Sequence, residues 1–222
     1  AEAYGRILAL DLVSPMTVPP FDNAAMDGYA LRVADVPTIG TRMAVSQRVA
    51  AGDVAQALQP GTAARIFTGA QLPAGADTVV MQEYCLAEGG DVVVQELPRP
   101  DQHIRHAGSD LQTGKTILAA GSRLSAAALG LAASVGFARL PVRRRLRVAI
   151  FFTGSELTPP GEPLPPGRIY NSNRYVMRGY LQELGADIID LGIIRDDRDA
   201  TRDALRRAAA AADVVITSGG MS

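Results

Sequence analysis

The sequence contains a single cysteine, Cys85, so no disulfide can form within the chain. A lone cysteine fits a reducing compartment, and we expect the protein to be cytoplasmic. No apolar run approaches the roughly 20 residues that a membrane-spanning helix needs. The formal net charge of −1 provides no basic field for nucleic acid or an anionic membrane. We therefore expect no nucleic-acid or membrane partner, and a buried or half-buried Cys85 rather than a catalytic thiol.

What the chain does contain is a sizeable apolar fraction, 47% of its 222 residues, which predicts one large domain or two modest ones. Residues 1–142 carry short apolar runs broken by glycine and proline, a pattern typical of short strands in a small sheet. Within this region Pro73–Gly75 predicts a turn. Residues 122–136 predict a helix that Ser125 caps and Gly136 ends.

The pattern changes in residues 143–222, where continuous apolar runs at 146–152, 186–194 and 213–220 predict buried parallel strands. Helical segments are predicted between them. The order strand–helix–strand–helix–strand indicates a parallel sheet with helices on its faces. Domains of this kind usually have more strands, so we expect this one to be partial. The predicted helices are 173–185, with Asn171 or Ser172 as cap, and 198–212.

Polar residues follow each of these strands, where parallel sheets bind their ligands. The loops supply the carboxylates of Glu156, Asp196 and Asp197. Gly219 and Gly220 leave backbone N–H groups open to a phosphate. Carboxylates beside a phosphate favour magnesium, a metal that takes hard oxygen ligands. For Asp197 or Asp199 the simpler interpretation is a cap of the helix that follows.

Two further patterns favour other sites only weakly. The segment GSDLQTGKT resembles a P-loop, but Gly108 and Gly114 are separated by five residues where the motif needs four, and no buried strand precedes it. His103 and His106 are three residues apart, yet no third zinc ligand is evident nearby. We expect neither a P-loop nor a zinc site.

The stretch PPFDNAAMDGYALR, residues 19–32, holds two acids, Asp22 and Asp27, among small and apolar residues. Asp27–Gly28 is compatible with the tip of a hairpin, because glycine adopts conformations closed to other residues. It is equally compatible with a functional site.

Seven segments occur in this order along the chain: PPFDNAAMDGYALR, RIFTGAQLPAGADTVVMQE, IRHAGSDLQTGKTI, VAIFFTGSEL, IYNSNRYV, IIRDD and VVITSGGMS. Together they resemble the molybdopterin molybdenumtransferase family, also called MoeA, which includes the E domain of gephyrin. The resemblance implies a small β-rich module plus a partial three-layer α/β/α molybdopterin-binding domain, an α+β and α/β multidomain chain. It also implies an elongated homodimer whose active cleft lies between the α/β domain of one subunit and the β-rich domain of the other.

The resemblance further implies an enzyme that inserts molybdate into adenylylated molybdopterin and releases AMP, with Mg²⁺ as cofactor. Contact with molybdopterin adenylyltransferase is a possible partnership. The family's functional residues fall on Asp27, Thr68, Asp110, Glu156 and Asp196, with Glu156 and Asp196 as metal ligands. The residues expected to bind the cofactor are Thr153, Gly154, Ser218, Gly219, Gly220 and Ser222.

Three departures from the family pattern predict a somewhat less acidic site: Ala24, Ser155 and Asn171. Asp22 matches no functional position, and we expect it to accept hydrogen bonds from backbone N–H groups. The alternatives to an insertase are a module that binds a pterin nucleotide without inserting metal and a scaffold that grips a peptide.

Overall fold

The computed structural model describes residues 2–219, which contacts along the chain divide into two compact units. The β-rich unit comprises Leu12–Leu118 and Leu131–Phe137. The remaining described residues form the α/β unit, which contains the parallel sheet. The described segments before Leu12 and between Leu118 and Leu131 therefore group with the α/β unit, although the β-rich unit separates them in sequence.

The main sheet of the β-rich unit has six strands. Most neighbours are antiparallel, and β4 and β5 form the one parallel pair within this sheet. The order across the sheet is β6 (Thr78–Met81), β3 (Gly28–Leu31), β5 (Thr62–Ile66), β4 (Thr41–Val49), β8 (Asp91–Val94) and β7 (Cys85–Glu88).

Two short antiparallel pairs complete the β-rich unit. They join β1 (Leu12–Val13) to β10 (Thr116–Leu118) and β2 (Asn23–Ala24) to β9 (Ile104–Arg105). Single 3₁₀ turns lie at Val33–Asp35 and Gln82–Tyr84. The predicted turn is confirmed, because the Ala76 N–H donates to the Pro73 carbonyl at 3.1 Å.

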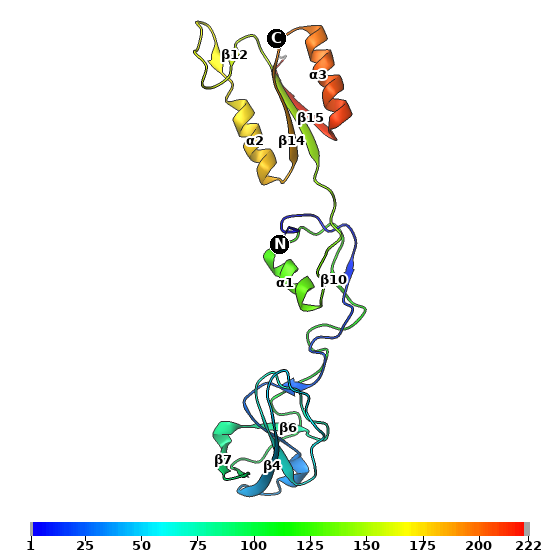
Figure 1. Cartoon of the computed structure of the whole chain (residues 1–222), viewed down its shortest axis with the longest axis vertical. Coiled ribbons are helices and arrows are strands. Elements are labelled where there is room, and N and C mark those ends of the chain that lie inside the picture. Colours follow the sequence, from blue (N-terminus) through cyan, green and yellow to red (C-terminus); the bar gives the residue numbers. More distant parts are fainter. Residues whose placement is uncertain (1, 220–222) are drawn as a thin grey trace. The chain divides into compact units, whose positions relative to one another are not determined.

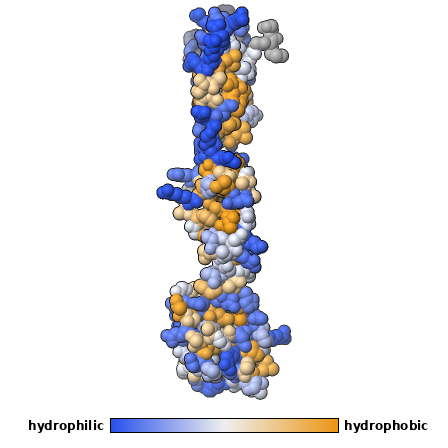
Figure 2. Space-filling model, turned by 90° about the vertical axis from the view of Figure 1, so that its right-hand side faces the viewer, coloured by the Kyte–Doolittle hydropathy of each residue, from blue (hydrophilic) through white to orange (hydrophobic). Residues whose placement is uncertain are grey.

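Successive side chains of a strand point to opposite faces of the sheet, and the six-stranded sheet has an apolar core on each face. One core gathers Ala30, Ala64 and Ile66, and the other gathers Leu31, Ala63 and Val92. In the view of Figure 2, hydrophobic residues at the surface of this unit are scattered among hydrophilic ones. Such scattered exposure is ordinary for a folded domain.

The α/β unit is built on a parallel three-stranded sheet in the order β14 (Asp187–Ile194), β11 (Arg147–Thr153), β15 (Val214–Ser218). Helices α2 (Asn173–Glu183) and α3 (Arg198–Ala211) cover its two faces (Figure 1). The predicted parallel sheet between two helices is confirmed. A short parallel pair, β12 (Leu157–Thr158) and β13 (Ile169–Tyr170), precedes α2.

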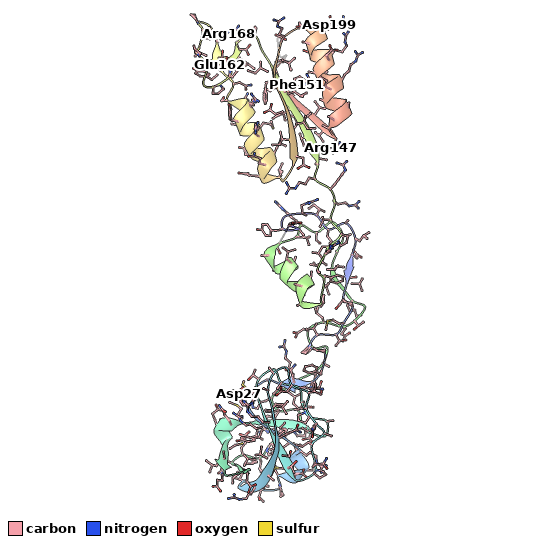
Figure 3. The ribbon with its side chains drawn as sticks, in the orientation of Figure 1. Asp27, Arg147, Phe151, Glu162, Arg168 and Asp199 are labelled. Atoms are coloured by element: carbon pink, nitrogen blue, oxygen red, sulfur yellow. The ribbon has the colours of Figure 1, made fainter. Side chains whose placement is uncertain are left out.

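Strand β11 is central and buried from Val148 to Thr153, which explains its continuous apolar run. Ile150 and Phe152 pack with Leu181 of α2. Phe151 points to the opposite face by alternation, and α3 covers that face through the buried Ala204 and Ala208 (Figure 3). The small alanines let α3 lie close to the strands.

The helix signals are largely confirmed. The hydroxyl of Ser125 accepts a hydrogen bond from the Ala128 N–H at 3.2 Å and caps α1 (Ala126–Ser134), which therefore begins after residue 122. Gly136 has a φ of +88°, and Gly185 has one of +75°, as expected beyond a helix end. Of the two candidate caps of α2, Asn171 is the one whose side chain accepts, from the Arg174 N–H at 3.2 Å.

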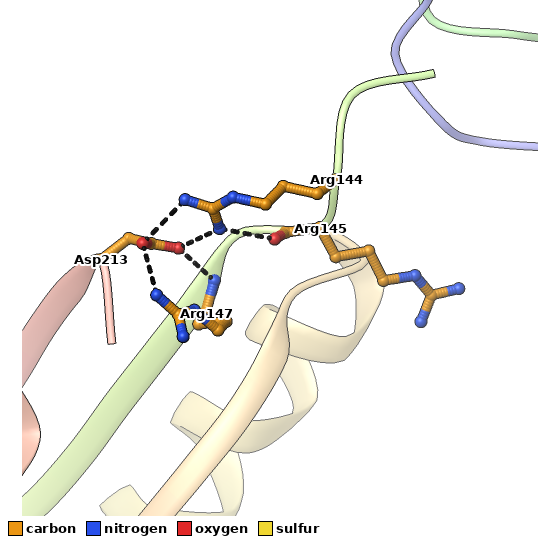
Figure 4. A network of polar contacts seen from close by, with 4 residues as sticks. All are labelled: Arg144, Arg145, Arg147 and Asp213. Carbon is orange, nitrogen blue, oxygen red and sulfur yellow. Dashed lines mark hydrogen bonds and ion pairs between the residues drawn. The ribbon is translucent and has the colours of Figure 1, made fainter. Parts of the chain in front are cut away.

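The start of the parallel sheet is held by one carboxylate, that of Asp213 (Figure 4). It accepts from Arg144 Nη1 and Nη2 at 2.5 and 2.9 Å, and from the Arg147 N–H and Nη2 at 2.9 and 3.2 Å. These hydrogen bonds, led by that of the Arg144 side chain, hold the pKa of Asp213 far below its usual value. The carboxylate therefore ties the beginning of β15 to the beginning of β11.

A second carboxylate, Asp190, joins α2 to the edge strand β14. Its side chain is 11% exposed and accepts from Arg174 Nε at 2.8 Å and Arg178 Nη1 at 2.9 Å. It also accepts from the N–H of Gly192, which has a φ of +75° where the register against β11 shifts. Burial raises the pKa of Asp190, but the hydrogen bonds from Arg174, Gly192 and Arg178 outweigh it, and the net pKa is lowered.

We expect Asp190→Ala to lower the free energy of unfolding of the α/β unit by about 2 kcal/mol at pH 7, because two charged hydrogen bonds are lost. Since the pKa is lowered from 3.8, this stabilisation is present above pH 3.8 and is lost as the pH falls through the folded-state value. Urea unfolding followed by the helical circular dichroism signal at pH 7 and at pH 3 measures both effects. Asp187→Ala is the matched control, because that carboxylate on the same strand is 58% exposed. An equal loss in both variants would contradict the assignment.

Candidate functional site

The carboxyl ends of the three parallel strands meet at one edge of the sheet. Thr153 of β11 is in register with Ile194, the last residue of β14, and Phe152 is in register with Ser218, the last residue of β15. The predicted residues Thr153, Gly154, Glu156, Asp196, Ser218 and Gly219 follow or end these strands. Gly220 and Ser222, also predicted to bind the cofactor, lie outside the described residues.

Gly219 approaches the backbone of Thr153 so closely that no side chain fits. A Cβ at residue 219 would lie 2.2 Å from the Thr153 carbonyl oxygen and 2.3 Å from its hydroxyl. The φ of Gly219 is +126°, which disfavours other residues independently. The glycine thus lets the end of β15 lie directly against the end of β11.

Glu156 folds back over Gly154 in the loop after β11. Both of its carboxylate oxygens lie 2.7 Å from the position that a Cβ of Gly154 would take. Glu156 is exposed, as are Asp196 and Ser155. The carboxylates of Glu156 and Asp196 are therefore open to solvent at the ends of their strands.

The acids that follow Asp196 have structural roles. Asp197 Oδ1 accepts from the Ala200 N–H at 2.8 Å and caps α3, which confirms the simpler interpretation of this residue. Asp199 pairs with Arg202 one turn later, at 3.0 Å. Asp196 itself lines an open groove along α3 whose other contributors include Arg198, Thr201 and Arg202.

In the β-rich unit, Asp27 and Thr68 form a hydrogen-bonded pair (Asp27 is labelled in Figure 3). Asp27 Oδ1 accepts from the Thr68 backbone N–H at 2.8 Å and from the Thr68 hydroxyl at 2.7 Å. These two bonds, the backbone bond first, hold the pKa of Asp27 below its ordinary value of 3.8, with a smaller contribution from the charge of Arg65. Asp27 is therefore a carboxylate at neutral pH.

Asp110 belongs to the same unit, and its carboxylate is engaged by the guanidinium of Arg105. The Asp110 N–H also donates to the Val18 carbonyl at 3.0 Å. Of the five residues predicted to be catalytic, the structure therefore joins Asp27 directly to Thr68. Glu156 and Asp196 lie in the α/β unit.

The hairpin interpretation of Asp27–Gly28 is wrong, because Gly28 is the first residue of β3 and pairs with Met81 of β6 and Ile66 of β5. A Cβ at Gly28 would lie 2.0 Å from the Val80 carbonyl oxygen. Close strand packing, not a turn, is what requires glycine here.

Asp22 is a structural acid, as predicted. Its Oδ1 accepts from the Ala107 N–H at 2.7 Å, and this bond is the main cause of its lowered pKa. Its Oδ2 lies 3.3 Å from His106 Nδ1. The residues between His103 and His106 form strand β9, so the two histidines do not share a helical face.

Comparison with known proteins gives matches along nearly the whole chain. A model described as the MoeA N-terminal region (domain I and II) matches residues 1–136. A second, described as a probable molybdopterin binding domain, matches residues 149–222.

The chain belongs to the MoeA family.

Relatives within the MoeA family agree with this assignment. The chain is 43% identical over 223 residues to a molybdopterin molybdenumtransferase of Haemophilus influenzae, covering 100% of this chain and 55% of the relative. A protein of the same name from Nostoc sp. is 42% identical over 225 residues, covering 99% and 52%. The chain thus spans about half the length of these relatives.

A solved structure shares the fold. The crystal structure of a molybdopterin biosynthesis MoeA protein from Pyrococcus horikosii matches with a TM-score of 0.89 and 36% identity, over 99% of this chain and 57% of that one. These findings confirm the resemblance and the mixed fold class that it implied. The boundary predicted at residue 142 stays a prediction.

Two of the three departures from the MoeA pattern are buried packing positions in this chain. Ala24 is 1% exposed and belongs to a core cluster, and Asn171 is 3% exposed and caps α2. Ser155 is exposed in the loop after β11, so it is the departure that changes the polarity of the sheet edge.

Magnesium, which the MoeA family implies, can be compared with the donors present. The described residues contain no group of three or more His, Cys, Asp or Glu side chains that could hold a metal ion. Glu156 and Asp196 nevertheless offer exposed carboxylate oxygens at the sheet edge. Magnesium is commonly held by one or two carboxylates together with substrate phosphates and water. The donors therefore fit an ion shared with a phosphorylated substrate and not an all-protein cage.

Cys85 is half-buried at the start of β7, as predicted. Burial, with smaller effects of nearby charges, raises its pKa from 9.0 to about 11. No helix of the described residues is long and apolar enough to cross a membrane.

We expect Cys85 to react with a thiol reagent at pH 8 about 100-fold more slowly in the folded chain than in urea, because a pKa rise from 9.0 to about 11 lowers the thiolate fraction by that factor. Release of thionitrobenzoate from Ellman's reagent measures the rate. A folded rate equal to the unfolded one would instead indicate an activated thiol.

Sequence reasoning missed two arginines beside the Asp27–Thr68 pair. The guanidinium carbons of Arg48 and Arg65 lie 4.4 and 4.5 Å from the centre of the Phe67 ring. Arg48 and Arg65 are 17 positions apart in sequence, and only the pairing of β4 with β5 brings them together. The adjacency of Arg65, Phe67 and Thr68 in RIFT is the one local signal that could have indicated them.

Proposed function

We propose that the protein inserts molybdate into adenylylated molybdopterin and releases AMP. The observation that carries this proposal is the convergence of exposed carboxylates, a hydroxyl and a close glycine contact at the carboxyl edge of the parallel sheet. Ligands of open α/β sheets bind at this edge. The name shared by the two relatives, molybdopterin molybdenumtransferase, supports the same reaction.

In this proposal the sheet edge binds the phosphorylated part of the substrate. Thr153, Gly154, Ser218 and Gly219 would present backbone groups and hydroxyls to phosphate oxygens. Gly220 and Ser222, which lie outside the described residues, are assigned the same binding role. Glu156 and Asp196 would hold Mg²⁺ together with a substrate phosphate. When bound, the ion would neutralise charge on the phosphate oxygens and make the phosphoanhydride easier to cleave.

We assign the proton chemistry to the Asp27–Thr68 pair, with Asp110 as a further acid of the β-rich unit. The Thr68 hydroxyl donates to Asp27, so its lone pairs face away and can accept from a ligand. Asp27 is ionised, and its Oδ2 is able to accept a proton from water or a ligand. In the homodimer that we propose, the β-rich unit of one subunit serves the α/β unit of its partner.

The remaining expectations belong to the same proposal. The enzyme would act in the cytoplasm and receive its substrate from molybdopterin adenylyltransferase. A module that binds the pterin nucleotide without inserting metal is the alternative. A scaffold role has no supporting feature among the described residues 2–219.

The test is AMP release from adenylylated molybdopterin, measured chromatographically with a longer version of the chain that includes the segments its relatives carry beyond the matched region. We expect release that requires both molybdate and Mg²⁺. Binding of the substrate without any release would favour the alternative module. Release that is independent of molybdate would contradict insertion.

A further inference from the structure

Arg48 and Arg65 form a like-charged pair on adjacent strands. They are direct register partners in the parallel pairing of β4 with β5, so their side chains leave the same face of the sheet. Tyr29 of β3 is the partner of Arg65 on its other side, and its ring centre lies 5.2 Å from the Arg65 guanidinium. Like charges directly opposite each other destabilise a sheet unless something offsets them.

Neither Arg48 nor Arg65 forms an ion pair with an acid within residues 2–219. Arg42, on the same strand as Arg48, shows the contrast. It pairs with Glu88 and, at 3.5 Å, with Asp91. The exposed Arg48 thus differs from its strand neighbour in having no carboxylate.

The guanidinium of Arg65 is hydrogen-bonded to its neighbours, whereas that of Arg48 is not. Arg65 Nη1 donates to the Gly28 carbonyl at 2.8 Å, and its Nη2 donates to Gln82 Oε1 at 2.5 Å. Arg48 is held by the face of Phe67, and no hydrogen bond of its guanidinium is found among residues 2–219. A planar guanidinium with free donors, stacked on an aromatic ring, is preorganised for bidentate contact with a phosphate.

The arginine pair lies next to the Asp27–Thr68 pair. The Gly28 carbonyl that Arg65 contacts belongs to the residue after Asp27, and Thr68 directly follows Phe67. The charge of Arg65 also reaches the Asp27 carboxylate. An anion held by Arg48 and Arg65 would therefore lie beside the groups to which proton chemistry was assigned.

We infer that Arg48 and Arg65, stacked on Phe67, form a binding site for the phosphate group of a small molecule. The identification of that molecule as the enzyme's nucleotide-bearing substrate rests on the proposed function. The binding of phosphate itself does not. The site supplies positive charge from the β-rich unit, independently of the sheet edge in the α/β unit.

The chain has no tryptophan, so a single tryptophan introduced at this site would be the only source of tryptophan fluorescence. Phe67→Trp keeps an aromatic face under the guanidinium groups, and tryptophan is the ring that cations prefer. We expect its fluorescence to change saturably on titration of the 222-residue chain with pyrophosphate, inorganic phosphate or AMP, and not with adenosine. A response to AMP alone would assign the site to a nucleotide, and a response to all three would assign it to phosphate in general.

Adding Arg48→Gln to Phe67→Trp should weaken phosphate binding at least about tenfold, because a bidentate charged contact is removed. Adding Arg48→Lys should recover part of the affinity. Arg42→Gln is the matched control, since it removes the same charge from the same strand, and binding should change less than about twofold. Thermal melting of each variant checks the fold.

Two results would overturn the inference: no saturable response to any phosphate, or equal weakening by Arg48→Gln and Arg42→Gln. The outcome separates from that of the proposed function. If the longer protein releases no AMP but phosphate binding still depends on Arg48, the proposed reaction is contradicted and the inferred phosphate site is retained.

Discussion

Replacing Gly28 with alanine should destabilise the β-rich unit by about 3 kcal/mol or more, the largest stability effect that we expect from any single methyl group in this unit. The added Cβ would lie 2.0 Å from the Val80 carbonyl oxygen and 2.8 Å from its carbon. Both atoms are backbone of the neighbouring strand β6, so no side-chain rotation relieves the contact. Chemical denaturation monitored by far-ultraviolet circular dichroism measures the loss.

Gly90→Ala is the control for this effect. Gly90 lies between β7 and β8 of the same sheet, and a Cβ there meets nothing within 4 Å. We expect a change within about 0.5 kcal/mol. Similar stability of the Gly28 and Gly90 variants would show that β3 and β6 are not as close as described, and would restore the turn interpretation of Asp27–Gly28.

If the proposed function holds, replacing Asp27 with asparagine in the longer protein of the AMP-release test should lower the rate of release about 100-fold while changing thermal melting little. The amide oxygen of asparagine can accept both hydrogen bonds that Thr68 donates, so the loop keeps its geometry. The negative charge and the capacity to take a proton are lost. Asp27→Ala should lower both the rate and the melting temperature, because Thr68 then loses its acceptor.

Asp22, five positions before Asp27 in the same stretch, provides the opposite case. Asp22→Ala removes the acceptor of the Ala107 N–H, so it should lower the melting temperature and reduce turnover only as far as folding is impaired. Wild-type turnover in Asp27→Asn would remove this residue from the chemistry. A melting loss in Asp27→Asn as large as that in Asp27→Ala would indicate a structural role instead.

The α/β unit was predictable because its signals are local. A central parallel strand such as β11 is buried on both faces and appears in the sequence as one apolar run, and Gly185 marks the end of α2 by its positive φ. The capping of α3 by Asp197 is likewise local, since donor and acceptor are three residues apart.

The β-rich unit was predictable only as a collection of short strands. Its order, in which β3 lies between β6 and β5, depends on contacts between residues far apart in sequence. The misinterpretation of Gly28 has the same origin, because the atom that excludes a side chain belongs to Val80. The same distinction between local sequence signals and long-range contacts applies to the candidate site residues. The acids Asp27 and Asp110 came from family motifs, whereas the Arg48–Arg65 pair follows from strand register.

The interleaved path of the chain has a consequence for protein synthesis. Gly5 donates its N–H to the Leu124 carbonyl, Ile7 pairs with Arg123, and Leu8 pairs with Val142. In the folded chain Leu8 is 0% exposed. These residues leave the ribosome before their partners, which follow only after the segment Leu12–Leu118, a delay of roughly 5–20 s at ordinary translation rates. Gly5, Ile7 and Leu8 therefore wait for these partners, whereas the segment Leu12–Leu118 can already close through the pairing of its own two ends, Leu12 with Leu118.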